Sequence, residues 1–218
     1  MNDNDTDGFP PPTPAASSVL ATLRSLIPES TLTLAETLQL IDAQAAALRA
    51  LAGASDTPCF PESFVTDIPS LRLDETSLPL HGYSFWDPSQ SRWVICRRSA
   101  DTTAERRFTL LHEFAHILWH SHEAELFPGL SEPTRKRLAE HAADMFAREV
   151  LMPRRLVKSA YCDGVRSSAQ LAAHFNVSAK AARSKLAQMD LGGPFPRPFT
   201  TPLPTRTEPR IEPLLEAA

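Results

Sequence analysis

Apolar positions along the first half of the chain predict two helices followed by two strands. Apolar residues recur at helical spacing over 31–52 and stop at Gly53, and a shorter run at 19–26 has the same pattern. Residues 81–86 and 92–97 carry β-branched and aromatic side chains on either side of a turn-forming Asp-Pro-Ser segment, which predicts an antiparallel hairpin. The intervening region is rich in proline and predicts no regular element.

The second half of the chain reads as helical throughout. Thr102 and Glu105 have the spacing of a capping box and predict a helix over 103–120. A second helix is expected from Ser131 to Pro153, where the missing backbone donor ends it. Three short helices are then expected over 153–160, 168–175 and 178–189.

Composition separates the ends of the chain from its middle. Many of the 20 prolines fall near the two ends, which predicts disordered, Pro-rich tails at 1–17 and 193–218. The formal net charge of −4 disfavours a dedicated nucleic-acid binder, whose surface is usually basic. Three widely spaced cysteines argue against a disulfide framework, and no apolar run is long enough for a membrane span. These features predict a reduced, cytoplasmic protein without membrane attachment.

The segment His112–His116, His-Glu-Phe-Ala-His, is the strongest chemical signal in the sequence. Residues four apart lie on one face of a helix, about 6 Å apart along its axis, so both imidazoles can bind one Zn²⁺. Glu113 is turned about 100° from His112, where its carboxylate reaches water on the metal instead of the metal itself. Because zinc lowers the pKa of bound water toward ~7, Glu113 is predicted to act as general base near neutral pH.

The surroundings of this motif favour a zinc site over a chance match. A helix that is apolar on every side is normally buried, and burying two histidines and a glutamate without partners costs several kcal/mol. Metal binding removes that cost. The apolar residues around the motif are Phe108, Leu110, Leu111, Phe114, Ala115, Ile117, Leu118 and Trp119.

A catalytic zinc site needs a third protein ligand and an open position. His122 has the spacing of the metzincin motif HExxHxxGxxH, but Trp119 replaces the glycine that lets the chain turn back. Glu140 and Asp144 share a face of the next predicted helix, so one can bind zinc while the other orients a ligating imidazole through its far N–H. Glu140 is therefore favoured as the third ligand, with Asp144 orienting a histidine. The less favoured histidines are His81, His120 and His141.

Two blocks of the sequence resemble the ImmA/IrrE family of metallopeptidases. The first is Arg107–His120 and the second is Glu140–Pro153. The second block discriminates better, because HExxH recurs in unrelated peptidases; it carries the family's Glu, Asp, Phe-Ala and closing Leu-Met-Pro. The resemblance covers about residues 35 to 192 and is strongest over 105–153.

The resemblance implies a fold, a cofactor and a reaction. The fold is α+β: a mainly helical, zincin-like metallopeptidase domain with a small antiparallel sheet. The site is gluzincin-like, with Zn²⁺ on His112, His116 and Glu140 and with Glu113 as base. Family members of this kind typically cut a cognate XRE-type helix-turn-helix repressor, so the resemblance implies site-specific endopeptidase activity that relieves repression in a stress, DNA-damage or mobile-element response.

The end of the chain resembles the family's small helix-turn-helix-like module. The matching residues include Phe175, Val177-Ser178 and Leu186, so the chain is divided into a metallopeptidase domain at 18–160 and this module at 161–192. The module has few basic residues for DNA binding, so packing or substrate docking is favoured over DNA contact. Those basic residues are Lys180, Arg183 and Lys185.

Several alternatives stay open at this stage. One is a non-proteolytic regulator that binds DNA or a repressor and uses the zinc structurally; another is a general degradative peptidase. The strands within 81–97 are a hypothetical docking edge for an extended substrate. The residues considered for stabilising an oxyanion are Tyr83, His141 and Tyr161, and the sequence carries no signal for an oligomeric state.

Overall fold

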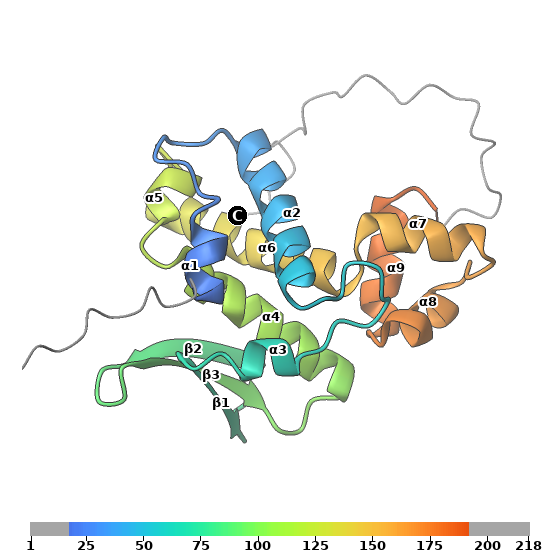
Figure 1. Cartoon of the computed structure of the whole chain (residues 1–218), viewed down its shortest axis with the longest axis horizontal. Helices are drawn as coiled ribbons and strands as arrows, with labels where there is room; N and C mark the ends of the chain where they lie inside the picture. The colour runs from blue at the N-terminus through green and yellow to red at the C-terminus, as the bar shows by residue number, and fades with distance from the viewer. Residues whose placement is uncertain (1–17, 192–218) are drawn as a thin grey trace, which may run out of the picture.

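Nine helices and three strands make up residues 18–191, the part of the chain that the computed structural model describes (Figure 1). The predicted tails at 1–17 and 193–218 lie outside the described residues. In chain order the elements are α1 (Val19–Arg24), α2 (Leu34–Leu51), α3 (Ser63–Thr66), β1 (Leu71–Thr76), β2 (Gly82–Asp87), β3 (Arg92–Arg98), α4 (Thr103–Trp119), α5 (Glu123–Leu126), α6 (Glu132–Leu151), α7 (Arg154–Cys162), α8 (Ser168–Phe175) and α9 (Ala179–Gln188).

Capping side chains fix where the helices begin. The box predicted at the start of α4 is present: Thr102 Oγ1 accepts from the Glu105 backbone N–H, while the Glu105 carboxylate accepts from the Thr102 N–H. These reciprocal bonds satisfy two of the backbone donors that a helix start leaves without partners. The same arrangement opens α2 and α8.

The sheet corrects the expectation of a purely antiparallel pair of strands. Its order is β1-β3-β2; β2 pairs with β3 antiparallel as predicted, but β1 lies on the other side of β3 and runs parallel to it. Pro69 and Pro79 lie just outside β1, so they bound this strand and do not interrupt it. The proline-rich region therefore holds the strand β1 and the short helix α3, and neither was predicted.

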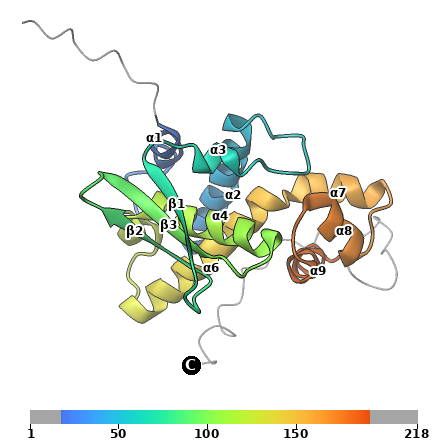
Figure 2. The same cartoon turned by 90° about the horizontal axis from the view of Figure 1, so that it is seen from below.

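Helix α4 lies between the sheet and a layer formed by α2 and α6 (Figures 1 and 2). Its side chains Leu110, Leu111, Phe114 and Ile117 are fully buried, and the Phe114 ring packs 6.2 Å from that of Phe146 on α6. α4 is thus buried on nearly every side, as its apolar sequence predicts. No helix within residues 18–191 combines the length and apolar character needed to cross a membrane.

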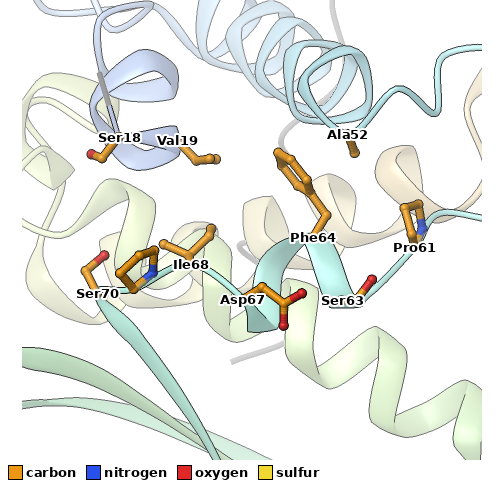
Figure 3. A pocket seen from close by; sticks show the side chains of 10 residues that line it. Ser18, Val19, Ala52, Pro61, Ser63, Phe64, Asp67, Ile68 and Ser70 are labelled. Atoms are coloured by element: carbon orange, nitrogen blue, oxygen red, sulfur yellow. The ribbon is translucent and has the colours of Figure 1, made fainter. Parts of the chain in front are cut away.

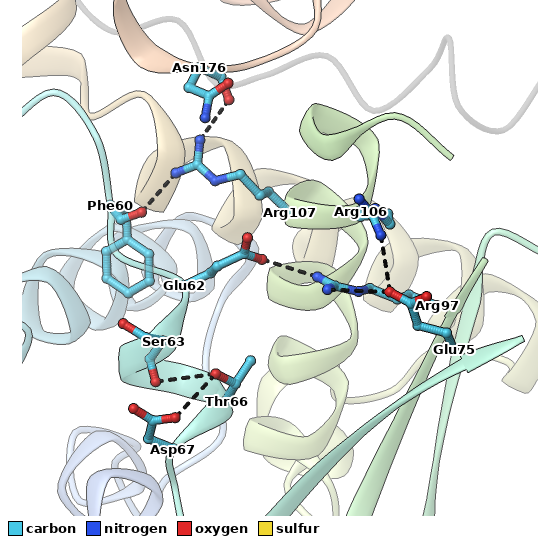
Figure 4. Close-up of polar contacts among 10 residues, drawn as sticks. All are labelled: Phe60, Glu62, Ser63, Thr66, Asp67, Glu75, Arg97, Arg106, Arg107 and Asn176. Atoms are coloured by element: carbon cyan, nitrogen blue, oxygen red, sulfur yellow. Dashed lines mark hydrogen bonds and ion pairs between the residues drawn. The ribbon is translucent and has the colours of Figure 1, made fainter. Parts of the chain in front are cut away.

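Two arginines tie separate parts of the chain together through backbone carbonyls. Arg24 of α1 donates to the Ile117 carbonyl at the end of α4 at 2.6 Å. Arg107 of α4 donates at 2.6 Å to the Asn176 carbonyl, which follows α8, and at 2.7 Å to the Phe60 carbonyl (Figure 4). Carbonyls at the ends of helices lack intrahelical partners, so a guanidinium both satisfies them and opposes the helix dipole.

An ion pair fastens α9 to α6. Lys185 is only 1% exposed and its Nζ pairs with the Glu149 carboxylate. Burial lowers the pKa of Lys185, although the charge of Glu149 opposes that shift. Breaking such a pair from one side leaves a buried charge without its counter-ion.

Replacement of Lys185 by Met is expected to lower the free energy of unfolding by about 2–4 kcal/mol, because Glu149 loses its partner. The double variant Lys185→Met/Glu149→Gln should recover most of that loss. Urea denaturation measures both, with Lys158→Met on the exposed face of α7 as the matched control. Equal effects of the Lys185 and Lys158 variants would show that the ion pair contributes nothing.

Candidate metal centre

The structure brings His112, His116 and Glu140 together at the packing interface of α4 and α6. The Nε2 atoms of the two histidines are 3.1 Å apart. Glu140 Oε2 lies 3.2 Å from His112 Nε2, and its Oε1 lies 3.4 Å from His116 Nε2. These three side chains form a group that can hold a metal ion.

The spacing of these three donors suits zinc. Ligands about 2.0–2.1 Å from a tetrahedral Zn²⁺ lie about 3.3 Å from one another. Here the two imidazole nitrogens are 3.1 Å apart, and each has a Glu140 oxygen within 3.4 Å, Oε2 for His112 and Oε1 for His116. Two imidazole nitrogens and one carboxylate oxygen are also the donor set of catalytic zinc sites with three protein ligands. The Glu140 side chain is 65% exposed, so the site opens toward solvent on this side.

Asp144 fixes the tautomer of His112. Its Oδ1 lies 3.0 Å from His112 Nδ1, and its Oδ2 accepts from Arg148 at 2.7 Å. Burial alone would raise the pKa of Asp144, but the hydrogen bond with His112 and the Arg148 charge outweigh it and lower that pKa. An ionised carboxylate only accepts, so Nδ1 carries the proton and Nε2 presents its lone pair to the site.

The net charge around His112 favours binding of a cation. Burial alone would lower the pKa of His112; the hydrogen bond with Asp144 and the negative charges of Glu113, Asp144 and Glu140 outweigh burial and raise it. The same three carboxylates that stabilise an imidazolium would stabilise a divalent ion on its Nε2.

Glu113 lies beside these donors and faces strand β2. It is buried, and its Oε2 accepts a hydrogen bond from Ser84 Oγ at 2.9 Å. Gly82 brings β2 against α4 at this point: a Cβ there would lie 2.2 Å from Thr109 Cγ2 and 3.4 Å from Glu113 Oε1. Neither Ser84 nor Gly82 was predicted as a site residue, although a glycine inside a predicted strand is a known signal of close backbone approach.

A cleft of about 790 Å³ contains all the predicted site residues. One wall is the start of β2 and the other is the first half of α9, with α4 and α6 between them. The lining also includes apolar side chains, those of Leu80, Phe108, Leu151 and Val177. The arrangement is that of a concave site with a few polar groups at one point.

The outer edge of β2 has free hydrogen-bonding groups that face this cleft. The Arg98 N–H donates to the His81 carbonyl at 3.0 Å, and Gly82 is opposite Arg97. In an antiparallel ladder bonded pairs alternate, so residues 81, 83, 85 and 87 bond to β3. The backbone groups of Gly82, Ser84 and Trp86 therefore point away from β3 toward the open edge.

The other histidines lie outside the three-residue group. His122 precedes α5, beyond the turn at Ser121, whose φ is 73°. The His120 ring packs edge-on against Trp93, and His141 is exposed on α6. Three residues were predicted as possible stabilisers of an oxyanion. Of these, Tyr83 lines the cleft, whereas His141 and Tyr161 do not.

A second hollow lies between α1, α3 and the end of α2, away from the histidines (Figure 3). It measures about 680 Å³, and its lining is mostly apolar, with Val19, Phe64 and Ile68 facing it. Asp67 is the one charged residue in its lining, so it lacks the donors of a metal site.

Comparisons with known proteins agree with the motifs and the fold. Residues 67–187, more than half of the chain, match a peptidase family, M78, that is described as the IrrE N-terminal-like domain. One similar solved structure is a Mycobacterium tuberculosis transcriptional regulator, with a TM-score of 0.56 and 14% identity over 78% of this chain and 51% of that one. This chain thus spans about half the length of that regulator, and the likeness shows the fold alone. No curated protein matches the sequence.

Removal of the Asp144 carboxylate is expected to weaken zinc binding about 10–100-fold, because His112 then loses the group that orients it. The comparison is between Asp144→Ala and Glu132→Ala, the latter an exposed carboxylate in the first turn of the same helix. Competition with a chromogenic chelator measures the affinity. Equal zinc affinities for the two variants would contradict the orienting role of Asp144.

Proposed function

Because the chain belongs to the IrrE N-terminal-like family of M78 peptidases, we propose that it is a zinc-dependent endopeptidase that makes a site-specific cut in an XRE-type transcriptional repressor. The cut would relieve repression in a stress, DNA-damage or mobile-element response. One observation carries the enzymatic part: the donors of His112, His116 and Glu140 converge in an open cleft that Glu113 also lines.

Three residues would hold the zinc and a fourth would keep one of them in place. His112 and His116 present Nε2, Glu140 presents a carboxylate oxygen, and Asp144 holds the His112 ring. When bound, zinc supplies Lewis-acid chemistry: it makes a water molecule more acidic and polarises the carbonyl under attack.

Glu113 would move the proton. Ser84 occupies one of its carboxylate oxygens, Oε2, while Oε1 lies toward the β2 main chain at Gly82. This hydrogen bond restricts the orientation of the carboxylate, and Oε1, which has no such bond from Ser84, would accept the proton of the attacking water and later deliver it to the leaving amine. Holding the base in one orientation is part of what makes proton transfer efficient.

The substrate would bind as an extended segment along the open edge of β2. Gly82 and Ser84 offer backbone donors and acceptors there, and the same two residues lie against Glu113. A segment that pairs with this edge therefore passes the catalytic residues. The exposed apolar side chains Leu80 and Phe85 on or beside the strand provide further contact area.

The choice of substrate rests on the family and on the shape of α9. The similar solved structure from Mycobacterium tuberculosis is a transcriptional regulator. This likeness supports a substrate that acts in transcription. In α9 one face is buried through Ala182, Lys185 and Leu186, and Lys180 and Ser184 line the cleft. This arrangement supports substrate docking over DNA contact for the C-terminal helices.

Glu113→Gln is expected to retain zinc and to lose cleavage by about 10²–10⁴-fold, because the amide cannot accept the proton. The assay combines the protein with the XRE-type regulator encoded nearest to its gene and follows fragments on a gel, with zinc and with chelator. A single discrete cut that chelator and Glu113→Gln both abolish supports the proposal.

Two further assays, one of repressor activity and one of casein cleavage, distinguish the alternatives. If Glu113→Gln relieves repression as strongly as wild type and the repressor is not cut, the result would favour a non-proteolytic regulator that uses zinc structurally. Rapid cleavage of casein at many positions would favour a degradative peptidase.

Proline at position 86 tests pairing with the edge of β2. The Trp86 N–H points away from β3, so Trp86→Pro removes an edge donor and leaves the ladder intact, whereas proline at Val94 in the central strand would break the sheet. Trp86→Ala loses the same ring and keeps the N–H. We expect kcat/KM for Trp86→Pro about fivefold below that of Trp86→Ala, the effect of one hydrogen bond. Equal values would exclude pairing at this residue.

A further inference from the structure

A buried carboxylate at the start of α4 holds an exposed histidine in the cleft. The Asp101 side chain is 0% exposed, and its Oδ1 accepts from Arg98 Nε at 2.5 Å. Its other oxygen, Oδ2, lies 3.1 Å from Nδ1 of His81. Burial would raise the pKa of Asp101, but the hydrogen bonds with His81 and Arg98 outweigh burial and lower it.

The carboxylate fixes one nitrogen of the ring and leaves the other open. An ionised Asp101 only accepts, so His81 Nδ1 must carry the proton and Nε2 must be the acceptor of the neutral ring. The His81 side chain is 73% exposed, and no hydrogen bond from its Nε2 is found among the described residues. An exposed histidine normally samples several rotamers; this one is held by a group that is itself fully buried.

His81 directly precedes the residues of β2 whose backbone groups point away from β3 toward the open edge. Its backbone carbonyl is bonded to Arg98, and the edge groups of Gly82 and Ser84 follow directly. The ring lines the same cleft as Glu113 and His112. However, Asp101, which holds the His81 ring, directly precedes α4. His112 is more than two turns further along that helix. The ring is not one of the three donors of the candidate metal site.

We propose that His81 is a substrate-positioning residue whose Nε2 accepts a hydrogen bond from a backbone N–H of an extended peptide in the cleft, just beyond the edge of β2. The proposal rests on the proposed peptidase function and adds a contact at the end of the cleft where α4 begins. Asp101 acts through His81, by fixing its tautomer and its direction.

The first experiment does not depend on cleavage. Zinc-loaded Glu113→Gln protein labelled with ¹⁵N-histidine is mixed with an equimolar pool of random decapeptides and followed by NMR. We expect the ¹⁵N signal of His81 Nε2 to shift on addition of the pool while that of His174, an exposed histidine on α8 outside the cleft, stays in place. In Asp101→Asn the shift should shrink severalfold. An unmoved His81 signal would overturn the proposal.

The second experiment separates binding from chemistry. Among the pool members that wild type cuts, the fastest is chosen by mass spectrometry, and its kcat and KM are measured. His81→Leu should raise KM about tenfold with kcat changed less than twofold. His81→Gln, which restores an acceptor near the position of Nε2, should recover most of the affinity, and His174→Leu should match wild type.

The outcomes distinguish this proposal from the peptidase function. An unchanged KM in His81→Leu, or no recovery in a folded His81→Gln, would show that His81 only covers Asp101. If wild type cuts no peptide and the pool still shifts the His81 signal, the contact stands and the peptidase function fails for these peptides. If it cuts none and the signal stays in place, the His81 contact is overturned, and the site-specific peptidase function is decided by the assay with the XRE-type regulator.

Discussion

The burial of α4 determines how the rest of the structure is arranged. This helix is apolar on nearly every side, and the sheet, α1 and α6 pack around it. The polar side chains that this helix buries cannot reach bulk water and need partners within the protein. His112 meets Asp144 of α6, Glu113 meets Ser84 of β2, and Arg107 meets the carbonyl of Asn176. The elements that meet these requirements are the ones that form the cleft.

This arrangement explains why a small domain can hold a rigid site. The three contacts run in different directions, so a displacement of the sheet, of α6 or of the C-terminal helices would break a hydrogen bond to α4. Arg107 and Lys185 fasten the α8–α9 pair at two points. The walls of the cleft are therefore coupled to the helix that presents Glu113 and the two histidines.

Local features of the site were predictable from the sequence and distant ones were not. A helix has a fixed period, so the shared face of His112 and His116 and that of Glu140 and Asp144 follow from spacing alone. The capping box at Thr102 is likewise a matter of four consecutive residues. Ser84 and Asp101 are different, since their roles depend on how β2 crosses α4. The parallel strand β1 was missed for a similar reason: its partner β3 lies beyond an intervening strand, and no short-range pattern identifies such a pairing.

The contact at Gly82 makes the residues that can be accepted at positions 82 and 109 depend on each other. A methyl group on residue 82 would overlap the methyl group of Thr109 and would lie 3.2 Å from the Cys96 carbonyl oxygen. The worst overlap is with Thr109, so a larger residue at 82 needs a smaller residue at 109 first. Substitutions at these two sites can accumulate in one order and not in the other, so neutral drift through this part of the cleft has a direction.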